Sequence, residues 1–258
     1  MLTYTLHIEI DSQYYALEDP ISITRKIILE PEYRAVDAFY LPDFTSKTFE
    51  YQDQFIGDIH RGGSCNVDVY TYSPHNHTHI EVSSHIVENG YTLNDLTQNE
   101  LSGIVLVIDL SDESFEDNLI RWKQIERKLR DIVPSTSMLA IKTKYSTESY
   151  PKFSGNNPIA VDPELSNKLT LHFPKIKILL LDLPSIDSES SEVLLAHRRF
   201  FNLPNEGITT EVKDKKGIVE LAKFTNVSDG YYFCMMSPPK TQTNAAITDI
   251  IFHSIQGI

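Results

Sequence analysis

The segment 103–110 constrains the fold of this chain of 258 residues more than any other stretch. It reads Gly-Ile-Val-Leu-Val-Ile-Asp-Leu, a short apolar run that does not alternate with polar residues. Strands of that composition are typically buried in the centre of a sheet, where both of their faces are covered. The run therefore predicts a central strand, and other parts of the chain must cover it.

Helix and strand patterns follow one another along the chain. Apolar residues recur at helical spacing over residues 115–129, until Pro134 ends the pattern. Asp162-Pro163 supplies the cap and the first-turn proline of a second helix, and residues 175–181 read as a buried strand. This interleaving predicts the α/β or α+β class, with helices and a mixed sheet, and we expect one domain spanning residues 1–258.

Histidines gather in the window 75–85, which holds four of the nine histidines of the chain and one carboxylate. At the average histidine content, about 0.4 histidines would be expected in such a window. The residues concerned are His75, His77, His79, Glu81 and His85. Imidazole and carboxylate groups at this density indicate a bound metal or acid-base chemistry.

The spacing of the cluster sets a condition on the backbone. On a straight strand, positions 75 and 79 would be roughly 13 Å apart, which is too far for one ion. If His75 and His79 share an ion, the chain must bend between them, and we expect the strand to break at Pro74. His79 and Glu81 can converge from adjacent positions on one face of a strand.

Three interpretations of the cluster compete. A cupin-type redox site would need a glutamate where Ser83 and Ser84 occur. The histidines could instead be surface residues or core residues with satisfied hydrogen bonds, which is the usual role of a single histidine. In a hydrolytic metal site, two histidines and a carboxylate hold the ion and another histidine moves protons. The density of the cluster favours this last interpretation.

The same window resembles the signature of the metal-dependent cyclase and kynurenine formamidase family. That signature is His-x-Gly-Thr-His-x-Asp-x-Pro-x-His, and residues 75–85 read His-Asn-His-Thr-His-Ile-Glu-Val-Ser-Ser-His. Residues 182–187, Asp-Leu-Pro-Ser-Ile-Asp, are similar to the family's Asp-x-Pro-Ser-x-Asp turn after a buried strand. His197 and Glu211 follow at about the family's intervals. The resemblance implies the family's fold, a swivelling β/β/α domain.

The resemblance also implies roles for individual residues. The first divalent ion, zinc or manganese, would be bound by His75, His79 and Glu81. A second ion, or the surroundings of the first, would involve His197 and Glu211, and His85 would be the catalytic acid-base. The implied reaction is cleavage of a C–N bond of a small aryl formamide or cyclic amide by metal-activated water, or a related ring closure. A homodimer or homotetramer is implied as well.

Three positions depart from the signature. His77 replaces a glycine and adds a ring that could bind substrate, Glu81 is one methylene longer than aspartate, and Ser83 replaces a proline. These departures leave an alternative open, a diverged and catalytically silent family member that binds a metal or a small ligand. For Asp182 and Asp187 we expect structural roles, at a strand end and as a helix cap.

Composition limits the partners and the compartment. The net charge of −13, without a basic stripe, argues against nucleic acid, and no apolar run is long enough to span a membrane. Cys65 and Cys234 are the only cysteines, and the N-terminus lacks the features of a secretion signal. We therefore expect a cytoplasmic protein that acts on a small molecule.

Overall fold

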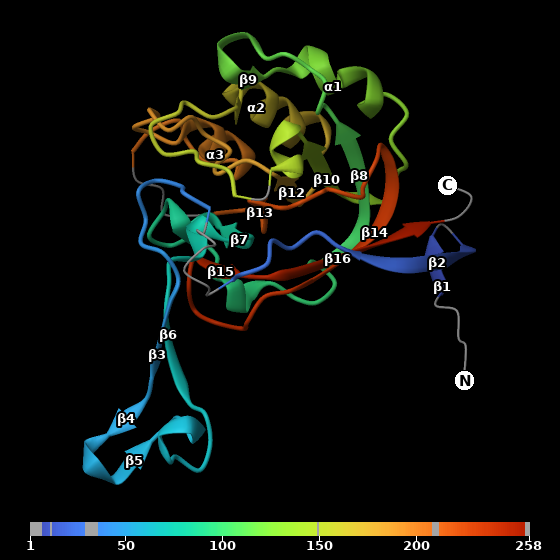
Figure 1. Cartoon of the computed structure of the whole chain (residues 1–258). Helices are drawn as coiled ribbons and strands as arrows, with labels where there is room; N and C mark the ends of the chain where they lie inside the picture. The colour runs from blue at the N-terminus through green and yellow to red at the C-terminus, as the bar shows by residue number, and fades with distance from the viewer. Residues whose placement is uncertain (1–6, 11, 29–35, 149, 208–211, 256–258) are drawn as a thin grey trace.

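β8 (Ser102–Asp109), which corresponds to the predicted central strand, lies inside a ten-stranded sheet in the computed structural model (Figure 1). The structure describes residues 7–10, 12–28, 36–148, 150–207 and 212–255. The order across the sheet is β1-β2-β16-β14-β8-β10-β12-β13-β7-β15. The other nine strands are β1 (His7–Ile10), β2 (Gln13–Ser22), β7 (His79–Val82), β10 (Thr136–Lys142), β12 (Ile178–Leu181), β13 (Gly217–Glu220), β14 (Gly230–Ser237), β15 (Ala245–Ile247) and β16 (Asp249–Ile255).

The sheet is mixed, as predicted. The four strands β8, β10, β12 and β13 run parallel to one another. β14 joins this block antiparallel at the β8 side, and β7 joins it antiparallel at the β13 side. The parallel block thus occupies the middle of the sheet, where the continuous apolar sequence of β8 is appropriate.

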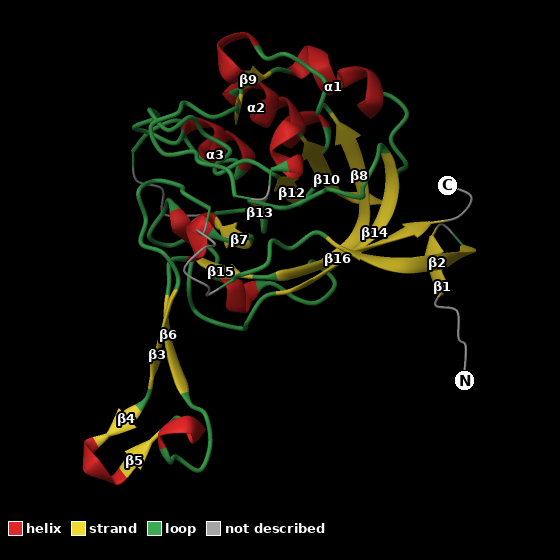
Figure 2. Cartoon of the chain, viewed as in Figure 1, coloured by secondary structure: helices red, strands yellow, loops and turns green. Residues whose placement is uncertain are grey.

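Side chains of β8 alternate between two hydrophobic cores, one on each face of the sheet. Leu106 and Ile108 belong to the core that is completed by helix residues such as Ile125. Val105 and Val107 belong to the other core. Figure 2 shows the three α-helices on the same side of the sheet. They are α1 (Trp122–Leu129), α2 (Pro163–His172) and α3 (Leu195–Phe200).

The helix predicted over residues 115–129 is shorter than expected, because α1 begins only at Trp122. Asp117 and Asn118 both have a φ of 56°, a left-handed conformation that interrupts helical geometry. The next residues form the short strand β9 (Leu119–Ile120), which pairs with β11 (Ala160–Val161). None of the helices in the described part of the chain is long and apolar enough to cross a membrane.

Helix α2 begins as the sequence predicts. The Asp162 carboxylate accepts a hydrogen bond from the backbone N–H of Glu164 at 2.8 Å, and Pro163 is the first helical residue. Both features stabilise a helix N-terminus, since proline has no N–H that would remain unsatisfied there.

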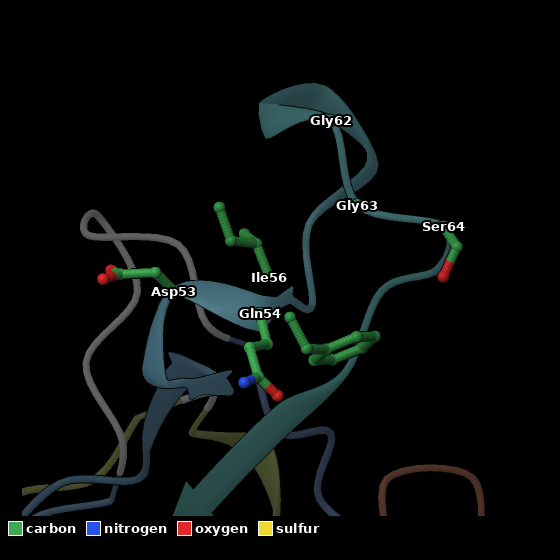
Figure 3. Close-up of a pocket in the computed structure, with 7 residues that line it drawn as sticks. Asp53, Gln54, Ile56, Gly62, Gly63 and Ser64 are labelled. Atoms are coloured by element: carbon green, nitrogen blue, oxygen red, sulfur yellow. The ribbon is translucent and has the colours of Figure 1, made fainter.

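A hairpin arm, defined here as residues 45–71, projects away from the rest of the molecule (Figure 1). Near the tip of the arm, a pocket is lined by residues 53–56 and 62–64 (Figure 3), and its lining includes none of the predicted site residues. The paired strands of the arm are β3 (Thr45–Thr48) with β6 (Asp68–Thr71), and β4 (Glu50–Tyr51) with β5 (Phe55–Ile56).

Candidate metal centre

The chain bends where the arm returns to the sheet. Strand β6 ends at Thr71, Pro74 begins a short 3-10 helix (Pro74–Asn76), and β7 starts at His79. The predicted break at Pro74 is therefore confirmed. The bend places His75 Nδ1 only 3.0 Å from His79 Nε2, a separation that a straight strand does not allow.

Strands β7 and β13 bring His79 between two carboxylates. The two strands pair antiparallel, with Glu220 directly opposite His79. The Nε2 atom of His79 lies 3.7 Å from Glu81 Oε2 and 3.5 Å from Glu220 Oε2. The other ring nitrogen, Nδ1, donates a hydrogen bond to the carbonyl oxygen of His77 at 2.9 Å. That bond leaves the lone pair of Nε2 available to a metal ion or a hydrogen-bond donor.

Two further imidazoles surround Glu81. His85 ends the short 3-10 helix that follows β7, and its Nε2 lies 3.6 Å from Glu81 Oε2. His197, on α3, donates from Nε2 to Glu81 Oε1 at 2.6 Å and from Nδ1 to Asp187 Oδ2 at 2.7 Å. His197 is buried, whereas the side chains of His75 and His85 retain 20% and 25% exposure. Solvent can therefore reach the centre on the side of His75 and His85.

Asp182 has the predicted structural role. Asp187 was expected to cap a helix that follows it directly, but α3 begins only at Leu195 and its N-cap residue is Leu194. Asp182, at the end of β12, accepts hydrogen bonds from the backbone N–H and hydroxyl of Thr143 and from the hydroxyl of Ser146. Asp187 accepts from the backbone N–H groups of Ala196 and His197 at 2.9 and 3.0 Å, in the first turn of α3. Its additional bond to the His197 ring was not foreseen.

The imidazoles differ strongly in basicity. Burial, together with the neighbouring His79, lowers the pKa of His75 to about 3, and burial also lowers the pKa of His85. Burial opposes charge on His197 too, but the Glu81 and Asp187 carboxylates outweigh it and raise the pKa of His197 to about 10. At neutral pH, His75 and His85 are therefore neutral and His197 is protonated.

The two glutamates also differ. Burial would raise the pKa of Glu81, but the adjacent His197 holds it well below its usual value. Burial and the nearby negative charge of Glu81 raise the pKa of Glu220 well above its usual value. In the protein without an ion, Glu81 is thus the ionised carboxylate and Glu220 tends to hold a proton.

One atom shows that these residues fit a cation. Glu81 Oε2 is buried and has no hydrogen-bond partner, although it lies 3.5–3.7 Å from nitrogen atoms of three imidazoles. An unpaired buried carboxylate oxygen is costly unless a cation compensates it. Among the described residues, two sets of side chains each offer ligand atoms that all lie within 4.8 Å of one another, and both sets include Glu81. They are His75, His79, Glu81 and Glu220; and Glu81, His85 and His197. Imidazole and carboxylate ligands suit zinc and manganese.

His77 lies apart from both sets of potential ligands. Its ring is buried and stands edge-on to Phe44 and Tyr72, with ring centroids 5.6 and 6.3 Å away, where the arm meets the sheet. Burial lowers the pKa of His77 to about 4, so the ring is neutral. The structure therefore places this ring against the base of the arm, while its carbonyl oxygen orients His79.

Glu220 is the residue of the centre that sequence reasoning missed. The residue expected instead, Glu211, lies outside the described residues, as does most of the strand predicted around it. The signal for Glu220 was a charged residue inside the apolar run 217–222, Gly-Ile-Val-Glu-Leu-Ala. A carboxylate in a strand that is buried on both faces needs a partner, which here is the histidine on the adjacent strand.

Comparisons with known proteins bear on this centre. The Cyclase family model, described as "Putative cyclase", matches residues 2–188. A comparison with curated proteins found no match. Among solved structures, a potential metal-dependent hydrolase with cyclase activity is 20% identical, with a TM-score of 0.66 over 91% of this chain and 97% of that one.

Two further solved structures share the fold. A predicted metal-dependent hydrolase from Bacillus stearothermophilus is 20% identical, with a TM-score of 0.65 over 91% of this chain and 98% of that one. Isatin hydrolase A from Labrenzia aggregata is 16% identical, with a TM-score of 0.63 over 91% of this chain and 93% of the other. These likenesses confirm the fold that the sequence predicted.

Proposed function

The chain belongs to the cyclase family, and on that premise we propose that it is a metal-dependent hydrolase that cleaves the C–N bond of a small amide. The observation that carries this proposal is the buried Oε2 atom of Glu81, which has no hydrogen-bond partner and faces three imidazoles. A site built only for stability would pair that oxygen with a donor.

His75, His79, Glu81 and Glu220 would hold a divalent ion, zinc or manganese, and His85 and His197 would surround Glu81 on the other side. When bound, the ion supplies Lewis acidity and makes a water molecule more acidic. An ion held by the first set of residues would leave His85 free to move protons, whereas an ion held by the second set would take His85 as a ligand.

His85 has the properties of the acid-base residue. Its ring is partly exposed, so that a substrate can reach it, and burial of the remainder lowers its pKa and keeps it neutral. A neutral imidazole accepts a proton at Nε2 as water attacks the carbonyl, and can return it to the leaving nitrogen. His197 holds Glu81 in place through its 2.6 Å hydrogen bond, so this carboxylate cannot swing toward the substrate.

The substrate class that we propose is a small aryl formamide or a cyclic amide. Two features support it: membership of the cyclase family, and a fold shared with isatin hydrolase A. A ring closure by the same residues is the related possibility within this class. We propose a cytoplasmic enzyme.

We also propose that the chain forms a homodimer or homotetramer. The arm supports this idea, because large apolar side chains on it are exposed: Phe49, Tyr51, Ile59, Val67, Val69 and Tyr70. Light scattering coupled to gel filtration measures the mass directly, and a monomer at working concentrations would contradict the proposal.

Two measurements, made one after the other, test the proposed enzyme. Elemental analysis of protein purified without added metal should find stoichiometric zinc or manganese, which His79→Ala removes and which the exposed His172→Ala retains. Hydrolysis of a panel of aryl formamides and cyclic amides should then fall roughly 10²–10⁴-fold in His85→Ala. Absence of metal would refute the centre, and a metal-loaded protein without turnover would favour the catalytically silent alternative.

A further inference from the structure

The turn that follows β12 touches the metal centre twice without contributing a ligand. Within it, the backbone N–H of Ile186 donates to Glu220 Oε1 at 2.8 Å. The next residue, Asp187, accepts a hydrogen bond from His197 Nδ1 at 2.7 Å. Neither residue belongs to the sets of potential ligands. One short segment therefore fixes two side chains of the centre, which come from β13 and α3.

Asp187 binds His197 at two points. Its Oδ2 atom accepts from both the backbone N–H and the ring Nδ1 of His197, while Oδ1 accepts from the N–H of Ala196. The Ser191 hydroxyl makes a longer contact to Oδ1, at 3.3 Å. With the backbone and the ring held by one buried carboxylate, the imidazole has a single orientation, and its Nε2 points to Glu81.

We propose that Asp187 is a positioning residue of the metal centre: it binds the Nδ1 proton of His197 and thereby directs Nε2 of the ring at Glu81, which belongs to both sets of potential ligands. This inference rests on the proposed function. A carboxylate on the outer nitrogen of a histidine fixes the tautomer and increases the affinity of the inner nitrogen for metal. Capping of α3 alone would not require this, since an asparagine or serine oxygen also accepts backbone N–H groups.

The variant Asp187→Asn separates the positioning of the His197 ring from the hydrogen bonds to the first turn of α3. Asparagine has one acceptor oxygen in place of two and no charge, so it can still accept from the first turn of α3, but any bond that it accepts from Nδ1 goes to a neutral amide and not to a carboxylate. The matched control is Ser191→Ala, which removes a neighbouring contact to the same carboxylate and leaves the carboxylate itself. If the asparagine variant does not fold, Asp187→Ser takes its place, because serine has no carboxylate and is too short to reach the ring.

The first readout needs no metal. In proton NMR spectra of the metal-free protein, the buried and hydrogen-bonded Nδ1 proton of His197 should give a downfield signal, assigned by its absence in His197→Ala. We expect the signal at the same chemical shift in the wild type and in Ser191→Ala, and its loss or a clear upfield shift in Asp187→Asn. A signal at the wild-type chemical shift in Asp187→Asn would overturn the proposal.

The second readout is zinc affinity, measured by competition with a chromogenic chelator. We expect zinc to bind about 10–100-fold more weakly to Asp187→Asn, and Ser191→Ala to stay within about twofold of the wild type. Equal affinity of the wild type and Asp187→Asn would overturn the role of Asp187 and leave the proposed function intact. A wild-type protein that binds no zinc or manganese would refute the proposed function and this inference with it.

Discussion

Glu81 and Glu220 meet as two buried carboxylates on adjacent strands, and their environments make them unequal. Glu81 has a hydrogen bond from His197, whereas Glu220 has the backbone N–H of Ile186 and lies next to a negative charge. In the protein without an ion, these surroundings disfavour a second negative charge, and Glu220 tends to hold a proton. A bound divalent cation would favour the ionised form of both carboxylates, so metal binding would release a proton from Glu220.

Glu220→Gln tests this balance. The amide keeps an acceptor for Ile186 and cannot ionise, so we expect the metal-free protein, in which Glu220 tends to hold a proton, to be as stable as the wild type or more stable. Zinc affinity should fall by at least about tenfold, since one charged ligand is lost. Thermal unfolding without metal and chelator competition measure the two effects. Glu88→Gln, an exposed residue near the same centre in sequence, is the control. Unchanged zinc affinity would exclude Glu220 from the ligands.

Lys216 predicts a dependence of stability on pH. It is buried, its ammonium group donates to Thr170 Oγ1 and to the carbonyl oxygen of Phe200, and burial lowers its pKa from 10.5 to about 8. Between these two pH values the unfolded chain binds more protons than the folded one, so the free energy of unfolding should rise with pH from about 8 to 10.5. Below about pH 8 the unfavourable contribution is complete and constant.

Lys216→Met isolates that contribution from other groups that titrate in the same range. The wild type should gain up to about 3 kcal/mol of stability relative to the variant between pH 8 and 10.5. Urea unfolding of both proteins across this range measures the difference. A stability difference that does not change with pH would show that Lys216 remains charged in the fold.

At the scale of elements, Arg25 joins four segments beneath the centre. Its guanidinium donates to the carbonyl oxygens of Tyr145, Glu148 and Leu221, and its backbone N–H donates to the Thr78 hydroxyl. The same side chain contributes positive charge near the buried carboxylate Asp182. Arg25 thus connects the segment after β2 with β13, the start of β7 and the turn after β10.

Arg25→Met should destabilise the protein by about 3–5 kcal/mol, because it leaves three carbonyl groups without their donor and removes the positive charge near the buried Asp182. Arg198→Met is a matched control: Arg198 also donates to three carbonyl oxygens, but it is partly exposed, and water can replace it. We expect a loss below about 1 kcal/mol there. Urea unfolding measures both values, and equal losses would contradict this account.

The sequence predicted individual helices and strands better than it predicted which strands pair with each other. Periodicity and capping are local, so the strand at residues 103–110 and the start of α2 were recognisable. The bend at Pro74 followed from the length of a strand. The position of Glu220 opposite His79 depends on the antiparallel register of β13 and β7, which lie far apart in the sequence. No local pattern contains that register, and the site was therefore predicted without one of its carboxylates.

At the scale of the whole molecule, the arm of residues 45–71 projects away from the sheet and the helices (Figure 1). A two-stranded ribbon is at best marginally stable in water, and its edges can pair with another chain. The arm also joins the sheet beside the centre, since His75 follows β6 after a few residues. A partner that holds the arm would therefore steady one end of the segment that carries the first histidine.

The proposed oligomer leads to a prediction for the arm. Tyr51→Lys with Ile59→Lys places charges on two side chains of the arm that are 53% and 51% exposed. If the arm contacts a second copy, light scattering should show a smaller particle than the wild type. Zinc affinity should stay within about twofold, because the two sets of potential ligands among the described residues include no residue of the arm. Tyr14→Lys with Leu171→Lys, at exposed positions outside the arm, is the control and should keep the wild-type mass.

The outcomes separate two functions of the arm. A smaller particle that still binds zinc would mean that the arm serves assembly and that the centre folds within one chain. Loss of zinc together with assembly would mean that the bend at Pro74 needs the arm to be held, which links the oligomer to the His75–His79 pair at 3.0 Å. If the arm variant keeps the wild-type mass while the control variant dissociates, an oligomer formed through the arm is contradicted. The contact between copies would then lie on the sheet and helices.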